Sequence, residues 1–121
     1  MDRFLSGHRV LIVEDEMMVL MMIEDMLADL GCESVTAAGT INEAIALINA
    51  QTFDVAMLDM NLGGTKSHSV ADALAANGVP FIFSTGYSGH DMRDGYRDRS
   101  ILKKPFKFEE LVTILRPLVA Q

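Results

Sequence analysis

Residues 10–15 read Val10-Leu11-Ile12-Val13-Glu14-Asp15, four aliphatic residues that run directly into two acids. Other apolar segments of the chain end in the same way, at Asp59, at Ser84-Thr85 and at Lys103-Lys104. In a parallel α/β sheet, functional side chains collect at the carboxyl ends of the strands. The pattern therefore predicts a sheet that brings three acids, a hydroxyl and an ammonium to a single edge.

The rest of the chain alternates between strand and helix patterns. We expect strands over 9–14, 34–37 and 55–59, another after Pro80 and a fifth before Pro105. Helices are expected over 16–30, from Thr40, from the Gly63-Gly64 turn to Asn77, weakly over 88–95, and over 109–120, where Pro117 should disturb the last turn. Thr40 and Glu43 form a capping box. These units predict a flavodoxin-like α/β fold, with a five-stranded parallel sheet in the order 2-1-3-4-5 and helices on both faces.

Composition limits the class of protein. The 121 residues contain no repeat and no linker, which indicates one domain over 1–121. No uncharged apolar run approaches the roughly 20 residues that cross a bilayer, and the N-terminus does not read as a secretory signal. Cys32 is the only cysteine, which fits a reducing cytoplasm, and the net charge of −7 argues against nucleic acid as a partner. We therefore expect a cytoplasmic protein without a membrane or nucleic-acid partner.

In the 2-1-3-4-5 order, Glu14, Asp15 and Asp59 converge where the chain switches direction, with Thr85 one strand away and Lys104 reaching in. Carboxylates crowd together only around a cation, and an oxygen-lined site suits Mg²⁺ or Mn²⁺. With the charge neutralised, Asp59 can attack a phosphoryl group and form an aspartyl phosphate, which the lysine and the hydroxyl stabilise.

Asp54 is the natural control for this interpretation. It lies at the opposite end of the same predicted strand, roughly 16 Å from Asp59 at the usual rise per residue. We expect it to be an ordinary strand-entry residue without a role in the site.

Over essentially its whole length the chain resembles the receiver domains of bacterial two-component response regulators. The motifs that carry the resemblance are Val10–Glu16, Phe53–Asp59, Thr85-Gly86 and Lys104-Pro105-Phe106. The resemblance implies a phosphoryl donor, which is a histidine of a sensor kinase or of a phosphotransfer protein, and a cis peptide bond at Lys104-Pro105. It also implies residue roles: Asp59 as phosphoacceptor, Glu14 and Asp15 as the acidic metal pair, the Asn61 backbone carbonyl as a further metal ligand, Thr85 as switch hydroxyl and Lys104 as phosphate-binding lysine.

Two features distinguish the chain within that family. Ile101 stands three residues before Lys104, where most receivers carry a mobile aromatic ring, so we expect Tyr87 to take the switch role. The stretch Pro80–Tyr87 is similar to the signature of the "FAT GUY" receivers, with Ser84 for the usual Ala. That subgroup implies a single-domain regulator which signals by protein contact with a downstream target, or shuttles or drains phosphate.

Other functions remain open. A phosphatase of the haloacid-dehalogenase type also uses a strand-end Asp and Mg²⁺, but it places the nucleophile on its first strand. A flavodoxin-type FMN carrier shares the fold, but the acids at 14–16 would repel the phosphate of that cofactor. The serious alternative is a receiver-like module that binds partners without being phosphorylated.

The predicted helix over 16–30 carries more apolar residues than one core-facing stripe requires. A stripe of Met18, Met22 and Met26 is expected to stay partly exposed. Adaptable methionine surfaces suit docking, and receivers generally meet kinase helices with this helix.

Overall fold

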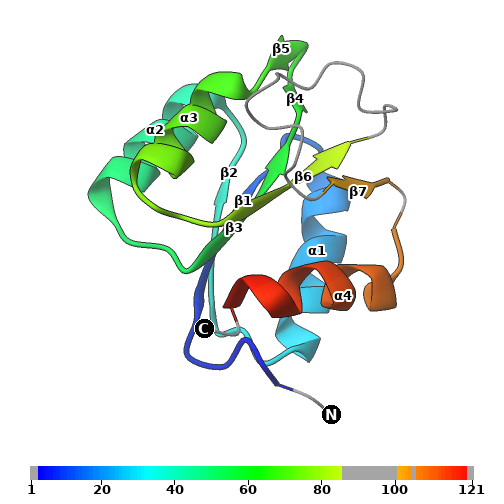
Figure 1. The fold of residues 1–121 in the computed structure, drawn as a ribbon. Coiled ribbons are helices and arrows are strands. Elements are labelled where there is room, and N and C mark those ends of the chain that lie inside the picture. The colour runs from blue at the N-terminus through cyan, green and yellow to red at the C-terminus, as the bar shows by residue number, and fades with distance from the viewer. Residues whose placement is uncertain (1–2, 86–100, 105, 120–121) are drawn as a thin grey trace.

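The computed structural model describes residues 3–85, 101–104 and 106–119, apart from the side chain of Thr85. Five parallel strands form the sheet (Figure 1), in the order β2-β1-β3-β6-β7. Their bounds are β1 Arg9–Val13, β2 Ser34–Ala38, β3 Val55–Asp59, β6 Phe81–Thr85 and β7 Ile101–Lys103. The predicted fold class and strand order are therefore confirmed.

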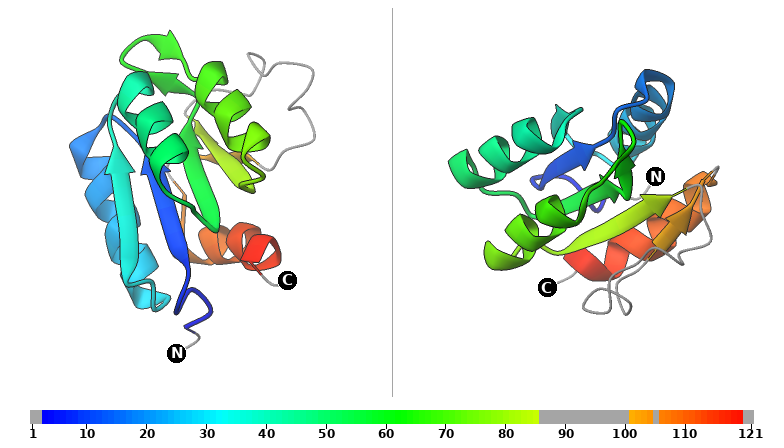
Figure 2. Two further views of the ribbon diagram at one scale, coloured as in Figure 1. Left: turned by 90° about the vertical axis from the view of Figure 1, so that its left-hand side faces the viewer. Right: turned by 90° about the horizontal axis from the view of Figure 1, so that it is seen from above.

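The described residues form four helices that cover the sheet on both faces (Figure 2), with α1 and α4 on one side and α2 and α3 on the other. Their bounds are α1 Met17–Asp29, α2 Ile41–Ala50, α3 His68–Ala76 and α4 Phe108–Val119. The helix expected over 88–95 lies outside the described residues. Pro117 falls inside α4, and the helix continues to Val119, so the proline does not end it.

The start of α2 shows how the sequence fixes a helix terminus. The Thr40 hydroxyl accepts a hydrogen bond from the Glu43 N–H at 3.1 Å, and the Glu43 carboxylate accepts one from the Gly39 N–H at 2.7 Å. The first bond satisfies a backbone donor that a helix start leaves without an intrahelical partner. The predicted N-cap at Thr40 is confirmed, whereas the Glu43 carboxylate bonds the Gly39 N–H in place of the Thr40 N–H that a capping box uses.

The predicted turn at Gly63-Gly64 is confirmed, and so is the helix that follows it. The turn belongs to a small antiparallel hairpin that was not predicted, β4 Asn61–Leu62 and β5 Thr65–Lys66, and α3 begins only at His68. Both glycines have positive φ, 56° and 87°, which a two-residue hairpin turn of this kind requires and which other residues rarely adopt. The hairpin rises above the carboxyl ends of the strands (Figure 1).

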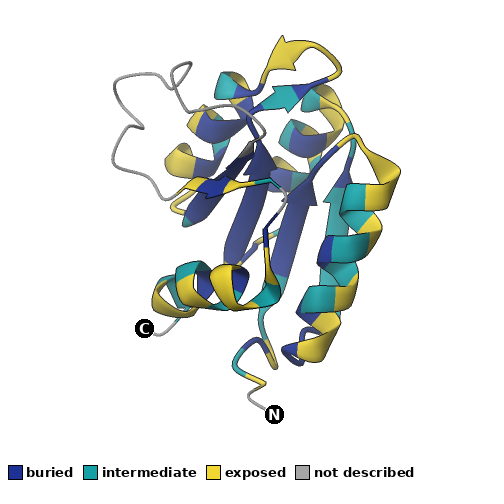
Figure 3. Cartoon of the chain, turned by 90° about the vertical axis from the view of Figure 1, so that its right-hand side faces the viewer, coloured by how far each residue is buried: buried dark blue, intermediate teal, exposed yellow. Residues whose placement is uncertain are grey.

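Successive residues of the central strands point to opposite faces of the sheet. On β3, Ala56 and Leu58 belong to the core under α2 and α3, whereas Val55 and Met57 belong to the core under α1 and α4. All five β3 residues are buried (Figure 3). Asp59 is therefore the end of a rigid strand that is packed on both faces, which fixes the position of its side chain.

Candidate functional site

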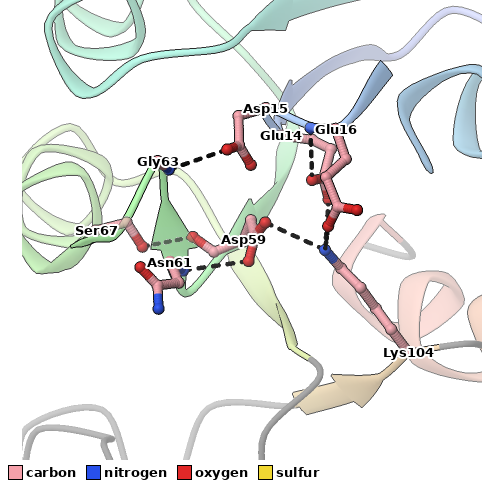
Figure 4. A network of polar contacts seen from close by, with 8 residues as sticks. All are labelled: Glu14, Asp15, Glu16, Asp59, Asn61, Gly63, Ser67 and Lys104. Atoms are coloured by element: carbon pink, nitrogen blue, oxygen red, sulfur yellow. Dashed lines mark hydrogen bonds and ion pairs between the residues drawn. The ribbon is translucent and has the colours of Figure 1, made fainter. Parts of the chain in front are cut away.

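Asp59 lies at the centre of a cluster of polar contacts at the carboxyl ends of the strands (Figure 4). Its side chain is buried, yet both oxygens have partners: Oδ1 accepts a hydrogen bond from the Asn61 N–H at 3.1 Å, and Oδ2 lies 3.1 Å from Lys104 Nζ. The Ser67 hydroxyl donates to the Asp59 backbone oxygen at 2.6 Å. These contacts hold the carboxylate in one orientation.

Lys104 supplies the positive charge of the site. It follows β7 by one residue, and its Nζ reaches Glu14 Oε1 at 2.8 Å as well as Asp59, with Glu16 further away at 3.8 Å. Burial on its own would lower the pKa of Lys104, but the Glu14 and Asp59 carboxylates outweigh burial and raise this pKa above its usual value. The ammonium therefore stays charged between two buried acids.

Glu14 and Asp15 differ in exposure although they are adjacent. Glu14 is buried, and burial raises the pKa of its carboxyl group in spite of the opposing effect of Lys104. Asp15 is exposed, and its Oδ2 accepts a hydrogen bond from the Gly63 N–H at 3.0 Å, which ties the β4–β5 hairpin to the end of β1. The hairpin that the sequence did not predict thus helps to position one of the predicted acids.

The three acids are close enough to share one cation. One oxygen from each of Glu14, Asp15 and Asp59 can be chosen so that all three lie within 4.8 Å of one another. Hard oxygen ligands of this kind suit Mg²⁺, and three carboxylates against one lysine leave a net negative charge for a cation to neutralise. The cleft beside them has a volume of about 420 Å³ and is lined by Asp15, Glu16, Asp59, Asn61, Gly63, Gly64 and Lys104.

A larger cavity, of about 710 Å³, lies at the amino ends of the strands and is lined by residues that include His8, Asp54 and Pro80. None of the predicted site residues lines it. Asp54 is exposed there, as expected of a strand-entry residue.

Several predicted site residues lie outside the polar cluster around Asp59 or outside the described residues. Ile101 is 37% exposed on β7 and takes no part in the polar cluster. Thr85 ends β6, but its side chain lies outside the described part of the structure, as do Tyr87 and Pro105 with its predicted cis bond.

The sequence analysis missed two residues that contribute to the polar cluster. Glu16 could have been included from its position beside Glu14 and Asp15, whereas no sequence signal marks Ser67.

The predicted methionine stripe is partly exposed, as expected, but unevenly. Met18 is 84% exposed, whereas Met22 and Met26 are half-buried and pack against the core under α1 and α4. The most exposed methionines of the described residues are Met17, Met18 and Met21, which gather at the amino-terminal end of α1 directly after Glu16. We refer to these three residues as the methionine patch.

Comparison with known proteins gives one family for this fold and site. The family model described as response regulator receiver domain matches residues 10–116. Among curated proteins, the transcriptional regulatory protein PdtaR of Mycobacterium tuberculosis is 29% identical over 118 residues, which cover 94% of this chain and 58% of PdtaR. The chain thus spans only about half the length of the curated relatives it matches.

Two solved structures match this chain over nearly their whole length. SdrG from Sphingomonas melonis Fr1 is 41% identical with a TM-score of 0.82, and the match covers 96% of this chain and 98% of that one. The receiver domain of a sensor histidine kinase from Pseudomonas aeruginosa PAO1 is 29% identical with a TM-score of 0.79, covering 96% and 100%. That receiver was solved with a magnesium ion coordinated in its active site cleft. Within the described residues, no helix combines the length and the apolar character that a membrane span requires.

Proposed function

The chain belongs to the response regulator receiver domain family, and from this membership we propose that it accepts a phosphoryl group on Asp59 from a histidine of a kinase or phosphotransfer protein. A receiver domain is a phosphoacceptor signalling module rather than an enzyme. The observation that carries the proposal is the placement of the Asp59 carboxylate, held between Lys104 Nζ and the Asn61 N–H at the edge of an acidic cleft.

In the proposed transfer, an oxygen of the Asp59 carboxylate attacks the phosphorus atom of a phosphohistidine. The P–N bond breaks, the imidazole nitrogen keeps the electron pair, and Asp59 becomes an acyl phosphate. Lys104 carries the charge that can stabilise a phosphoryl oxygen, and Thr85 is the proposed partner of a second one. Because Lys104 already contacts Asp59 at 3.1 Å, its ammonium is in reach of a group added to that carboxylate.

Glu14, Asp15, Asp59 and the Asn61 carbonyl are the residues we propose as ligands of Mg²⁺ or Mn²⁺. The closeness of the three acidic side chains supports this assignment. The bound ion supplies positive charge that offsets the acids and the incoming phosphoryl oxygens. The exposed position of Asp15 leaves one side of the set open to solvent, as an exchangeable ion requires.

The methionine patch supports a proposal about the phosphoryl donor. Met17, Met18 and Met21 are more than half exposed, and they follow Glu16, which lines the cleft. We propose that they contact the helices of the donor while its histidine approaches Asp59. Replacing all three by Gln should slow phosphorylation by a kinase but not by acetyl phosphate, a small donor that needs no docking. Equal slowing with both donors would contradict this role.

The whole of 1–121 is proposed to act as one cytoplasmic receiver domain of the "FAT GUY" subgroup, with output through contacts to a target protein. The similarity to SdrG over 98% of that chain supports a unit of this size. Tyr87 and Thr85 are the proposed switch residues, because Ile101 is aliphatic and exposed where an aromatic ring is usual.

The second candidate function is a receiver-like module that binds partners without phosphorylation, and the exposed Ile101 is the observation that favours it. Intact-mass measurement after incubation with acetyl phosphate and Mg²⁺ separates the two. We expect one added phosphoryl group on the wild type and none on Asp59→Asn. A wild type that stays unmodified, while a matched receiver with known activity is modified in the same buffer, would favour the binding module.

A further inference from the structure

Ser84 carries an unexplained polar atom close to the site. The residue is 2% exposed on β6, and its hydroxyl oxygen is buried without a hydrogen-bond partner among the described residues. Most buried side-chain polar groups in native proteins do have a partner, because an unpaired one loses its bonds to water and gains nothing in return. A buried hydroxyl under these conditions calls for a functional explanation.

The strand register places Ser84 beside Asp59. The two residues are directly paired between β3 and β6, and Ser84 is also paired with Leu102 on β7. Paired residues on neighbouring parallel strands point to the same face of a sheet. Met57, two residues before Asp59, and Leu102 belong to the core under α1 and α4. The side chains of Ser84 and Asp59 therefore share that face.

Lys104 crosses the end of the same strand. It starts after β7, the edge strand, and its Nζ reaches Asp59 on β3 and Glu14 after β1. Because β6 lies between β7 and β3, the lysine side chain passes over the end of β6 that carries Ser84. Figure 4 shows the extended course of this side chain towards the two acids.

The Lys104 ammonium group has one hydrogen-bond donor more than it has close carboxylate partners. An ammonium group has three donors. Two of them face Glu14 and Asp59 at 2.8 and 3.1 Å, and the next carboxylate, of Glu16, is 3.8 Å away. Within the described residues, one ammonium donor without a close partner and one hydroxyl without a partner thus lie on the same face of the sheet.

We propose that Ser84 is a positioning residue for Lys104: its hydroxyl accepts a hydrogen bond from the ammonium when that ammonium moves from Glu14 to a phosphoryl group on Asp59. This inference rests on the proposed function. The bond forms only in the phosphorylated state, whereas the cost of the unpaired hydroxyl falls on the unphosphorylated one. Ser84 thereby favours the phosphorylated state without contacting the phosphoryl group itself.

The test compares Ser84→Thr with Ser84→Val, two variants of nearly equal shape that differ in one hydroxyl. The probe is beryllofluoride, which stands for the phosphoryl group on an aspartate, and its affinity is measured by calorimetry in the presence of Mg²⁺. Loss of one hydrogen bond to a charged group should weaken beryllofluoride binding by roughly tenfold in Ser84→Val, while Ser84→Thr stays near wild type. The affinity for Mg²⁺ alone should be equal in all three proteins.

Ser84→Ala provides a second comparison, since a smaller side chain avoids crowding. It should bind beryllofluoride as weakly as Ser84→Val and, without ligand, melt at or above the wild-type temperature. Equal beryllofluoride affinities of the Thr and Val variants, or an Mg²⁺ affinity that falls in parallel, would overturn the role of Ser84 and leave the proposed function intact. A wild type that binds beryllofluoride no better than Asp59→Asn would overturn both.

Discussion

The two ends of β3 each carry an aspartate, and the two carboxylates have different surroundings. Asp54 at the amino end is exposed, and its Oδ2 accepts one hydrogen bond from the Arg9 N–H at 2.7 Å. Asp59 at the carboxyl end is 6% exposed and faces a lysine. Two residues of the same type, at opposite ends of one strand, thus have different environments. Asp54 makes a solvated strand-entry contact, whereas Asp59 belongs to a charged, desolvated cluster.

The cations at the two ends show why. At the amino end, the Arg9 guanidinium donates to the neutral Gln51 side chain at 2.6 Å and lies over the Phe53 ring at 5.6 Å. At the carboxyl end, Lys104 is placed between acids from two other strand ends. What distinguishes the ends is convergence of like charges around one cation, and this convergence depends on strand order rather than on any single residue.

The largest difference between the ends should appear in phosphorylation. We expect Asp15→Asn to lose acetyl-phosphate-dependent modification to background, because a shared cation site loses one of three carboxylates, whereas Asp54→Asn should be modified like the wild type. Without metal, Asp15→Asn should melt no lower than the wild type, since it relieves crowding of like charges. Intact-mass spectrometry and thermal melting in EDTA measure the two effects. Modified Asp15→Asn, or a clear loss of its melting temperature, would contradict the picture of crowded acids.

The next difference concerns stability. Lys104→Met leaves the buried Glu14 and Asp59 without their cation, and breaking such a pair typically costs about 3 kcal/mol. Arg9→Met removes contacts that are mostly solvent-exposed and should cost no more than about 1 kcal/mol. Urea denaturation in EDTA near neutral pH gives both free energies of unfolding. Equal losses would mean that the two ends are electrostatically alike.

Added Mg²⁺ should widen the difference between Lys104→Met and Arg9→Met. Because Lys104 occupies the oxygens of Glu14 and Asp59 in this structure, its removal frees them for a cation. Added Mg²⁺ should therefore raise the melting temperature of Lys104→Met by more than that of the wild type or of Arg9→Met.

The sequence predicted which side chains meet at the carboxyl ends of the strands, but not the local structure around them. The apolar runs that end in Glu14-Asp15, Asp59 and Lys104 predicted that these side chains lie at one edge of the sheet, because parallel strands share one direction. The strand order was predicted from the alternation of strands and helices and from the chain length, which favours the order 2-1-3-4-5. The hairpin at Asn61–Lys66 was missed, since glycines at 63 and 64 are equally compatible with a loop before a helix. The high exposure of Met17 and Met21 was not predicted, because the rotation of α1 is set by packing: Met22 and Met26 turn partly towards the core, and Met17 and Met21 do not. The pairing of Asp59 with Ser84 required the register.

The pH dependence of stability should also differ between the wild type and Lys104→Met. The pKa of Lys104 is raised above 10.5, so its contribution is complete below that pH and is lost as the pH rises through the raised value. The pKa of Glu14 is raised above 4.5, so its ionised form costs stability at neutral pH, and this cost disappears on acidification. In Lys104→Met no ammonium offsets that cost, so acidification from neutral pH should stabilise this variant relative to the wild type. Melting curves across pH measure the difference, and Arg9→Met, which should track the wild type, is the control. Parallel pH curves for Lys104→Met and wild type would contradict the coupling of Lys104 to Glu14.

The smallest effect concerns a buried thiol at the amino end of the sheet. Cys32 precedes β2 by two residues, and burial raises the pKa of its thiol. Unlike for Glu14, no described cation contributes to the pKa shift of its thiol. Its Sγ lies 3.7 Å from the His8 carbonyl oxygen and 3.6 Å from that of Ser34, which both accept a hydrogen bond from the protonated form. Since the thiolate is the reactive species, iodoacetamide at mildly alkaline pH should modify native Cys32 at least about tenfold more slowly than the unfolded chain.

Beryllofluoride with Mg²⁺ should leave the modification rate of Cys32 unchanged, because charge added at the carboxyl ends of the strands is neutralised there by Lys104 and the metal. A Cys32 rate that changes on beryllofluoride binding would show that the two ends are coupled through the sheet, and the contrast between Asp54 and Asp59 would then describe one connected site rather than two independent ones.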